Sequence, residues 1–367
     1  MPEVLHLIPY DTVGGVETAA RTVPARWDGR AGAVRFRRAY LVSHSAVEVF
    51  PEDWHGPAVS VNHPVAHWKL LRFALQSRAD LVVASLWRSC PTVIALKLLR
   101  PRTRTVLFLH SAVDVHLPDR LLNRAAMYLA DEIWADSPTT LEARVPAAAR
   151  GRARVLSFLT RRPPGLDRRA PPQAGTGAIA PRFIYWGRLQ AEKNLGRALE
   201  VFAAIRKRVP GARFDIFGPD RGALAGLQAQ AHALGLDEAV RIPGPLPQEA
   251  LLARARDYSF YLQTSHFEGM AMSVIEAMAV GLVPVVTPVG EIPSYCQDGV
   301  TGLHVTTPED TARRVTALID DPASWRALSD RAAARWAGAD LFQDDYRAAC
   351  DALLSRPATG RPPACVD

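Results

Sequence analysis

Short apolar runs alternate with amphipathic segments along nearly the whole chain. Strands are predicted in the first part where apolar runs are bounded by turn residues, at 4–9, 34–43, 58–62, 81–86, 105–110 and 132–136. Helices are predicted where apolar residues recur every three to four positions, at 68–76, 92–99 and 120–130. Short strands that alternate with helices of this length are typical of βαβ units and a parallel sheet.

The alternation is interrupted at residues 161–182, which are rich in Pro, Gly, Ala and Arg and have no amphipathic period. This composition predicts an interdomain linker. The pattern then restarts, with strands predicted at 183–186, 214–217, 240–242, 259–263 and 283–287. Helices are predicted at 195–209, 224–234, 249–257, 272–280, 308–336 with a break, and 341–354. The Pro-rich tail 356–367 is predicted to be loose.

The 367 residues are enough for two domains of ordinary size. We therefore predict two α/β domains, residues 1–160 and 183–340, on either side of the linker. Two parallel sheets joined in this way predict a cleft, with ligands bound at the carboxyl ends of strands.

Hydrophobic residues make up 48% of the chain and charged residues 22%, which is typical of a globular protein. No apolar run is long enough to span a bilayer, and residues 1–9 show no secretion signal, so a cytoplasmic location is expected. The four cysteines have neither disulfide-framework nor metal-ligand spacing.

Positive charge is concentrated in the first domain. Residues 1–160 carry 20 Lys or Arg against 14 Asp or Glu, whereas residues 161–367 carry 24 against 23. The excess indicates an anionic partner such as a membrane face, a phosphorylated lipid or nucleic acid. The alternative is an Arg-rich composition without function, because the chain holds 40 Arg and only four Lys.

The strongest chemical signal lies at residues 266–281, where Glu268 and Glu276 stand eight positions apart. Glu268 is expected on a loop after a strand, and Glu276 in a helix whose unpaired N–H groups favour a diphosphate. Carboxylates suit sugar hydroxyls, which can donate to them. Two alternatives stay open: Ser273 and Glu276 also fit a capping box, and Glu268 fits a solvated loop residue.

A second signal follows the strand at 183–186, where Gly187 and Arg188 precede Lys193. Two cations at a strand's carboxyl end can neutralise a diphosphate leaving group. The alternative is a surface charge run in which Asn194 caps the next helix.

Two weaker signals lie in the first domain. Gly14 and Gly15 follow the first strand, where paired glycines suit the approach of a phosphate or an acceptor, or form an ordinary turn. His110 ends the strand at 105–110, where it can contact a sugar or serve only the structure.

Taken together, these residues resemble the retaining family-4 glycosyltransferases of the GT-B fold. The matching stretches are residues 187–188 and 192–194, the Glu268–Glu276 pair, residues 298–302, and the glycine loop at 14–17. The resemblance covers essentially the whole chain and is strongest over 183–305. It implies two Rossmann-like parallel-sheet domains that face each other across a cleft, with helix 341–355 crossing back onto the first domain.

The resemblance also implies roles. Arg188 and Lys193 would bind the donor diphosphate, Glu276 the ribose and Glu268 the donor sugar. His110 would contact that sugar near the reacting carbon. The remaining donor contacts would come from backbone groups of Gly14, Gly15, Gly269, Met270, Ala271 and Met272. No metal or other cofactor is expected.

One stretch departs from the family pattern. Many relatives carry Gly-Gly-x-Pro-Glu after the last core strand, whereas this chain has Glu291 at the second glycine and Ser294 at the glutamate.

The expected function is retaining transfer of a hexose-type sugar from a UDP- or GDP-sugar. The acceptor would be a glycan or lipid-linked molecule of cell-surface polysaccharide or glycolipid synthesis. Alternatives are a sugar-nucleotide epimerase of the same fold and a degenerate, non-catalytic sugar-nucleotide-binding protein.

The acceptor would bind the first domain. Residues 68–78 combine Trp68 with Lys69, Arg72 and Arg78, which predicts peripheral contact with the inner face of an anionic membrane. An amphipathic helix packed on the sheet is the alternative. Nucleic-acid binding is not expected, because no recognition motif accompanies the basic residues.

Overall fold

The computed structural model describes residues 1–12, 14–30, 32–43, 50–114, 116–160 and 178–356. The chain divides into two compact units. Unit 1 comprises Met1–Thr160 and Asp340–Asp367, and unit 2 comprises Arg161–Ala339. The stretch 161–177 of the predicted linker and residues 357–367 of the predicted tail lie outside the described residues.

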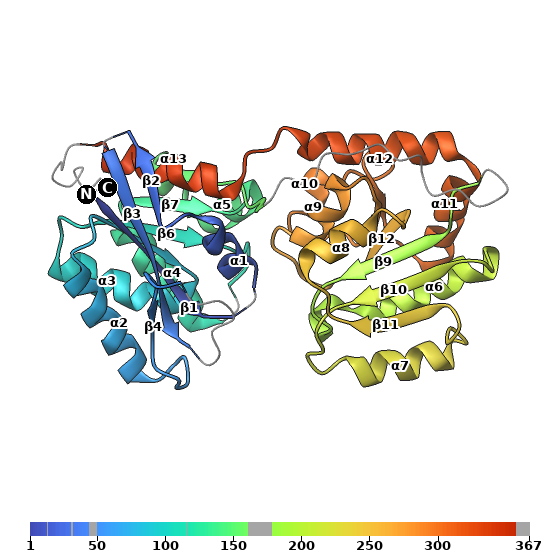
Figure 1. Cartoon of the computed structure of the whole chain (residues 1–367), viewed down its shortest axis with the longest axis horizontal. Coiled ribbons are helices and arrows are strands. Elements are labelled where there is room, and N and C mark those ends of the chain that lie inside the picture. Colours follow the sequence, from blue (N-terminus) through green and yellow to red (C-terminus); the bar gives the residue numbers. More distant parts are fainter. Residues whose placement is uncertain (13, 31, 44–49, 115, 161–177, 357–367) are drawn as a thin grey trace. The chain divides into compact units, whose positions relative to one another are not determined.

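Unit 1 contains a mainly parallel sheet in the order β2-β3-β1-β5-β6-β7-β8, with β4 paired to β3 (Figure 1). Among the described strands of this sheet, β2 alone runs antiparallel to its neighbour. The strands are β1 (Glu3–Tyr10), β2 (Arg26–Gly29), β3 (Gly32–Val42), β4 (Trp54–His55), β5 (Leu81–Ser85), β6 (Arg104–Leu109), β7 (Glu132–Ala135) and β8 (Ala153–Val155). Its central strands are almost wholly buried, as expected for a sheet covered on both faces.

The helices of unit 1 connect these strands in βαβ units. They are α1 (Gly15–Thr22), α2 (Pro64–Ser77), α3 (Cys90–Leu99), α4 (Leu117–Leu129) and α5 (Pro138–Arg144), with 3-10 helices η1 (Trp87–Ser89) and η2 (Ala147–Arg152). Pro64 and Pro138 are the first residues of their helices, where the missing N–H has no helical partner to lose.

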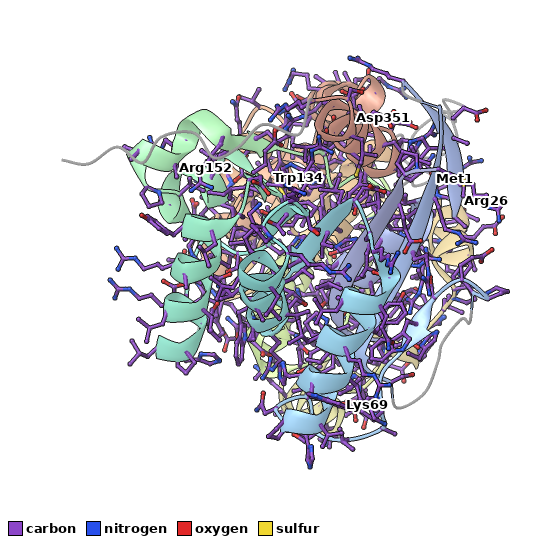
Figure 2. The ribbon with its side chains drawn as sticks, turned by 90° about the vertical axis from the view of Figure 1, so that its left-hand side faces the viewer. Met1, Arg26, Lys69, Trp134, Arg152 and Asp351 are labelled. Carbon is purple, nitrogen blue, oxygen red and sulfur yellow. The ribbon has the colours of Figure 1, made fainter. Side chains whose placement is uncertain are left out.

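The last helix, α13 (Phe342–Leu354), belongs to unit 1. Tyr346 is fully buried and stacks on His6 of β1, with ring centroids 5.4 Å apart. The indole N–H of Trp27 donates to Asp351 at 3.0 Å. Figure 2 labels Asp351 on this helix and Trp134 of β7, whose ring meets Tyr346 edge-on. A segment about 180 residues distant in sequence therefore completes the core of unit 1.

Unit 2 contains a six-stranded, fully parallel sheet in the order β11-β10-β9-β12-β13-β14. Numbered from its first strand this is 3-2-1-4-5-6, the Rossmann order, which reverses between β9 and β12. The strands are β9 (Arg182–Trp186), β10 (Arg213–Phe217), β11 (Val240–Gly244), β12 (Phe260–Gln263), β13 (Val283–Val286) and β14 (Leu303–His304).

The helices of unit 2 are α6 (Leu195–Arg208), α7 (Leu224–Ala233), α8 (Gln248–Ala255), α9 (Met272–Ala279), α10 (Ile292–Tyr295), α11 (Pro308–Asp320) and α12 (Pro322–Ala337), with the 3-10 helix η3 (Ala191–Lys193). Among them, α10, α11 and α12 have a proline in their first turn, and α11 and α12 also have a side-chain cap. The predicted break within 308–336 falls at Asp321, whose side chain accepts from Ala323 and Ser324 N–H groups and so begins α12.

One predicted strand is wrong. Residues 58–62 form bends and turns, and the strand in this region is β4, at Trp54–His55. The run Ala58-Val59-Ser60-Val61-Asn62 alternates like a strand, but Val59 and Val61 instead pack on the core cluster beside α2. Tertiary packing thus overrides the local alternation. No element was predicted for the short segments that form α1, β2, α5, β8, α10 and β14.

We expect Tyr346→Ala to lower the free energy of unfolding of unit 1 by about 3–5 kcal/mol, because a large aromatic side chain is removed from a closed core. Tyr128→Ala is the control, since Tyr128 is 75% exposed; it should change stability by about 0.5 kcal/mol or less. Urea unfolding measures both, and equal effects would contradict the packing role of α13.

Candidate functional site

The carboxyl ends of β9 and β12 lie next to each other where the strand order of unit 2 reverses. Open parallel sheets of this type bind ligands outside this point, because the flanking loops leave the sheet in opposite directions. The loop after β9 carries Arg188 and Lys193, and the loop after β12 carries Glu268. The strand order alone therefore brings two of the predicted signals to one edge.

Lys193 and Glu268 form an ion pair at this edge. The Lys193 Nζ lies 2.6 Å from Glu268 Oε1, and the two side chains are only 17% and 8% exposed. Gln263 Nε2 and Ser265 Oγ donate to the same oxygen at 2.8 and 2.6 Å. These three donors offset the cost of withdrawing the carboxylate from water. The alternative of a solvated loop residue at 268 is therefore wrong.

Backbone contacts hold the two loops together. The His266 N–H donates to the Glu192 carbonyl at 2.9 Å, and Thr264 Oγ1 donates to the Asn194 carbonyl at 2.7 Å. Asn194 stands at the N-cap of α6 but makes no side-chain capping bond. The partly buried pairing of Lys193 with Glu268 does not fit a surface charge run.

Arg188 is not part of this pair. Its side chain is exposed, and within the described chain its guanidinium makes neither an ion pair nor a hydrogen bond. The guanidinium is thus a cation on the loop after β9 that a ligand can engage.

Glu276 lies on α9, and the capping-box alternative is wrong. The helix begins at Met272, with Ala271 at the N-cap in a left-handed conformation, so Ser273 is already inside the helix. Ser273 Oγ instead donates to Gln263 Oε1 at 3.0 Å. Glu276 Oε2 accepts from the Trp186 indole at 2.9 Å, and Gln248 Nε2 donates to Oε1.

A hydrogen-bond network connects the two glutamates. Gln263 is almost fully buried and donates to Glu268, while its Oε1 also accepts from Tyr261 Oη at 2.9 Å. The oxygen of the same Tyr261 hydroxyl lies 3.2 Å from the carbonyl oxygen of Trp186. The indole N–H of Trp186 in turn donates to Glu276. Burial raises the pKa of the Tyr261 hydroxyl well above its ordinary value, so the hydroxyl stays a donor.

The sequence did not indicate the hydrogen bonds that Trp186, Gln248, Tyr261 and Gln263 make in this network. The only available signal was a tyrosine and a glutamine within the apolar strand β12, since polar groups in a buried strand require partners.

Residues 287–295 support the loop that carries Glu268. Gly290 has a φ of +59°, and a Cβ there would come within 2.1 Å of the Glu268 carbonyl. The Glu291 N–H donates to the Gly269 carbonyl at 3.1 Å, and Tyr295 Oη donates to the Met270 carbonyl at 2.7 Å. The departures from the family pattern therefore lie in a segment that fixes this loop: Glu291 is buried, and Ser294 Oγ bonds its carbonyl at 2.8 Å.

In unit 1, Gly14 is the N-cap of α1 and Gly15 its first residue. Gly14 has extended backbone, and an added Cβ would come within 2.3 Å of the buried Glu17 carboxylate. The turn therefore presents a helix N-terminus after β1, and its backbone conformation does not by itself require glycine.

His110 lies at the carboxyl end of β6 and shares a partner with His6. The Nε2 atoms of His110 and His6 lie 2.9 and 2.8 Å from Ser85 Oγ, and both Nδ1 atoms are buried without a partner among the described residues. Burial lowers the pKa of His110 from 6.5 to about 3. Burial, with His110 and Arg38 nearby, lowers the pKa of His6 as well. Both rings are therefore neutral at pH 7.

The described residues contain no group of three or more His, Cys, Asp or Glu that could hold a metal ion.

Comparison with known proteins gives a family match for unit 2. Residues 172–335 match the family model of glycosyl transferases group 1. The D-inositol 3-phosphate glycosyltransferase of Streptomyces griseus subsp. griseus is 32% identical over 193 residues, 47% of this chain and 41% of the relative. The GDP-mannose:cellobiosyl-diphosphopolyprenol alpha-mannosyltransferase of Komagataeibacter xylinus is 28% identical over 154 residues, 42% of this chain and 39% of the relative. The matched part thus spans less than half the length of either relative.

A solved structure matches over both units. Anabaena Alr3699/HepE, crystallised in complex with UDP, superposes with a TM-score of 0.76 at 16% identity, covering 97% of this chain and all of that chain. The chain therefore has the GT-B fold, with two Rossmann-like parallel-sheet domains, as predicted from the sequence.

The buried histidines predict a pH effect on stability. An unfolded chain binds a proton at His110 near pH 6.5, whereas the folded protein does so only near pH 3, so stability should fall as the pH drops through this window. His110→Gln should reduce the slope by up to about 1.4 kcal/mol per pH unit. Urea unfolding between pH 6.5 and 4 measures it. His232→Gln, at an 82% exposed side chain, is the control; an unchanged slope in H110Q would contradict a buried neutral His110.

Proposed function

We propose that this protein is a retaining, metal-independent glycosyltransferase that moves a hexose-type sugar from a UDP- or GDP-sugar to a glycan or lipid-linked acceptor. The observation that carries the proposal is the Lys193–Glu268 pair at the switch point of a Rossmann-ordered sheet. The family match of residues 172–335 supports a glycosyltransferase. One relative is named for a diphosphopolyprenol-linked acceptor and one structural neighbour contains UDP, which supports this choice of substrates.

Lys193 is suited to the leaving diphosphate. An ammonium has three donors, and the structure uses one of them on Glu268. A phosphate oxygen can therefore join the same ammonium without breaking the pair. Because the charge of Lys193 is already balanced by Glu268, the empty site carries no isolated buried cation. As negative charge grows on the leaving group, Lys193 and the exposed Arg188 stabilise it.

Glu268 is suited to the donor sugar. All three of its hydrogen bonds go to Oε1, so Oε2 accepts none from the described residues. Sugar hydroxyls can donate to this second oxygen, and Gln263 and Ser265 prevent the carboxylate from turning away. The adjacent turn at Gly269, Met270, Ala271 and Met272 leads into the N-terminus of α9, which favours a phosphate through its free N–H groups.

Glu276 is suited to a ribose. Its carboxylate accepts hydrogen bonds from Trp186 and Gln248, and a carboxylate is an acceptor that suits the hydroxyls of a ribose. In unit 1, His110 and the turn at Gly14 and Gly15 would supply the sugar and phosphate contacts expected from the resemblance. The neutral state of His110 lets it bond a sugar without adding a charge.

Nucleotide binding is the first expected outcome. In a thermal-shift screen of UDP, GDP, ADP, dTDP and CMP, one nucleoside diphosphate at ~100 times its dissociation constant should stabilise the protein by about 2.7 kcal/mol. The shift should persist in EDTA. No shift with any nucleotide would contradict the donor site, and a shift that requires a divalent cation would contradict metal independence.

Lys193→Ala and Glu268→Ala should each lower the turnover of sugar transfer by at least ~100-fold, because each removes a charged group from the transition-state environment. Glu192→Ala is the matched control, as Glu192 neighbours Lys193 but is exposed. Turnover is measured as acceptor-dependent release of the nucleotide, with circular dichroism to verify folding. Near-normal turnover in a folded variant would remove that residue from the site, and sugar conversion without an acceptor would indicate an epimerase.

A further inference from the structure

One segment of unit 1 has a net positive charge as large as that of the whole chain. Residues 64–129, from the start of α2 to the end of α4, contain ten Lys or Arg against three Asp and no Glu. Their net charge of +7 equals that of the whole chain. The three acids add little to the outer surface: Asp119 is buried, Asp114 pairs with Arg144, and Asp80 bonds the Glu3 N–H.

The outward side of α2 carries basic and apolar groups together. The helix packs on the sheet through Ala66, Leu70 and Ala74, as the packed-helix alternative predicted. Its opposite side exposes Trp68, with 57% of the residue accessible, beside the exposed Lys69 and Arg72. Figure 2 labels Lys69 on this helix. The helix therefore both completes the core and presents a cationic, aromatic surface.

The outward side of α4 repeats this combination. Leu117 and Leu121 are 65% and 57% exposed, and Arg120 and Arg124 are exposed on the same side. Helix α3 packs against both α2 and α4, so the three helices form one layer (Figure 1). The name basic–apolar face is used below for these outward residues: Trp68, Lys69 and Arg72 of α2, and Leu117, Arg120, Leu121 and Arg124 of α4. Within the described chain, none of its four cations is in an ion pair.

The composition of this face differs from that of an ordinary solvated helix. On α12 of unit 2, exposed Asp330 lies among exposed Arg326 and Arg331, which is the usual mixture of signs. The basic–apolar face has no exposed acid and places large apolar side chains between its cations. At the C-terminal ends of α2 and α3, Arg78, Arg100 and Arg102 line a surface pocket of about 600 Å³.

We propose that the basic–apolar face docks on a bilayer rich in anionic lipid. The cations are attracted to lipid phosphates, while Trp68, Leu117 and Leu121 gain from entering the interface between headgroups and acyl chains. A nucleic-acid backbone would attract the cations, but it would not bury the exposed leucines. None of the helices in the described part of the chain has the length and apolarity to cross a bilayer. This inference rests on the proposed function in one respect: a lipid-linked acceptor gives the protein a reason to contact a membrane.

The test is co-sedimentation of the full chain with vesicles at low salt. Vesicles of phosphatidylcholine with about 30 mol % phosphatidylglycerol should bind the protein, and pure phosphatidylcholine should not. R72S/R120S/R124S should weaken binding roughly 100-fold, because each lost charge costs about fivefold. W68A/L117S/L121S should also weaken it, since these side chains enter the interface. K207S/R208S/R326S is the charge-matched control on exposed positions of unit 2 and should bind like the wild type.

Thermal unfolding with and without the stabilising nucleotide is run on every variant. If the nucleotide raises the unfolding temperature of a variant as much as that of the wild type, the variant is folded. The same measurement separates this inference from the proposed function, because nucleotide binding can fail while vesicle binding persists. Three results would overturn the proposal: no binding of the wild type to anionic vesicles, equal losses in the control triple variant, or unchanged vesicle binding in W68A/L117S/L121S. The last result would indicate a polyanion-binding surface instead.

Discussion

A carboxylate that is withdrawn from water must be neutralised, and this requirement organises the candidate site. Glu268 meets it through Lys193 from the loop after β9, Gln263 at the end of β12 and Ser265 from the loop after β12. Those loops can meet only because β9 and β12 are neighbours in the sheet, although about 75 residues separate them in sequence. The pair therefore depends on the Rossmann strand order, and the position of the loop that carries Glu268 depends in turn on Gly290, whose lack of a Cβ leaves room for that loop.

The sheets of the two units carry different chemical groups. Unit 2 carries ions and amides, joined by a network that runs from Lys193 to Glu276. In unit 1, the neutral His6 and His110 both contact the Ser85 hydroxyl. The ring of Tyr346 from α13 stacks on His6. A charged site can hold a diphosphate, and that site lies within unit 2 by itself.

The outer surface of unit 1 is unusual in its charge. Helices α2, α3 and α4 use one side to bury the sheet, and a soluble protein would ordinarily give the other side a mixture of charges. In this chain the basic–apolar face combines exposed cations with exposed Trp68, Leu117 and Leu121 and has no exposed acid. The positive charge excess of the composition is thus found within residues 64–129, and the anionic bilayer is the partner we propose for it.

The sequence by itself determined the alternation of strands and helices, the two-domain α/β class and the positions of Arg188, Lys193, Glu268 and Glu276, because local periodicity and residue type decide these. It failed at residues 58–62, where packing against α2 overrides an alternating pattern. Only the tertiary structure decided that Lys193 pairs with Glu268, that Glu276 bonds Trp186 and Gln248 rather than capping its helix, and that Gln263 joins them. Such partners are chosen by strand order and burial, and no local pattern records which distant side chain will satisfy a buried polar group.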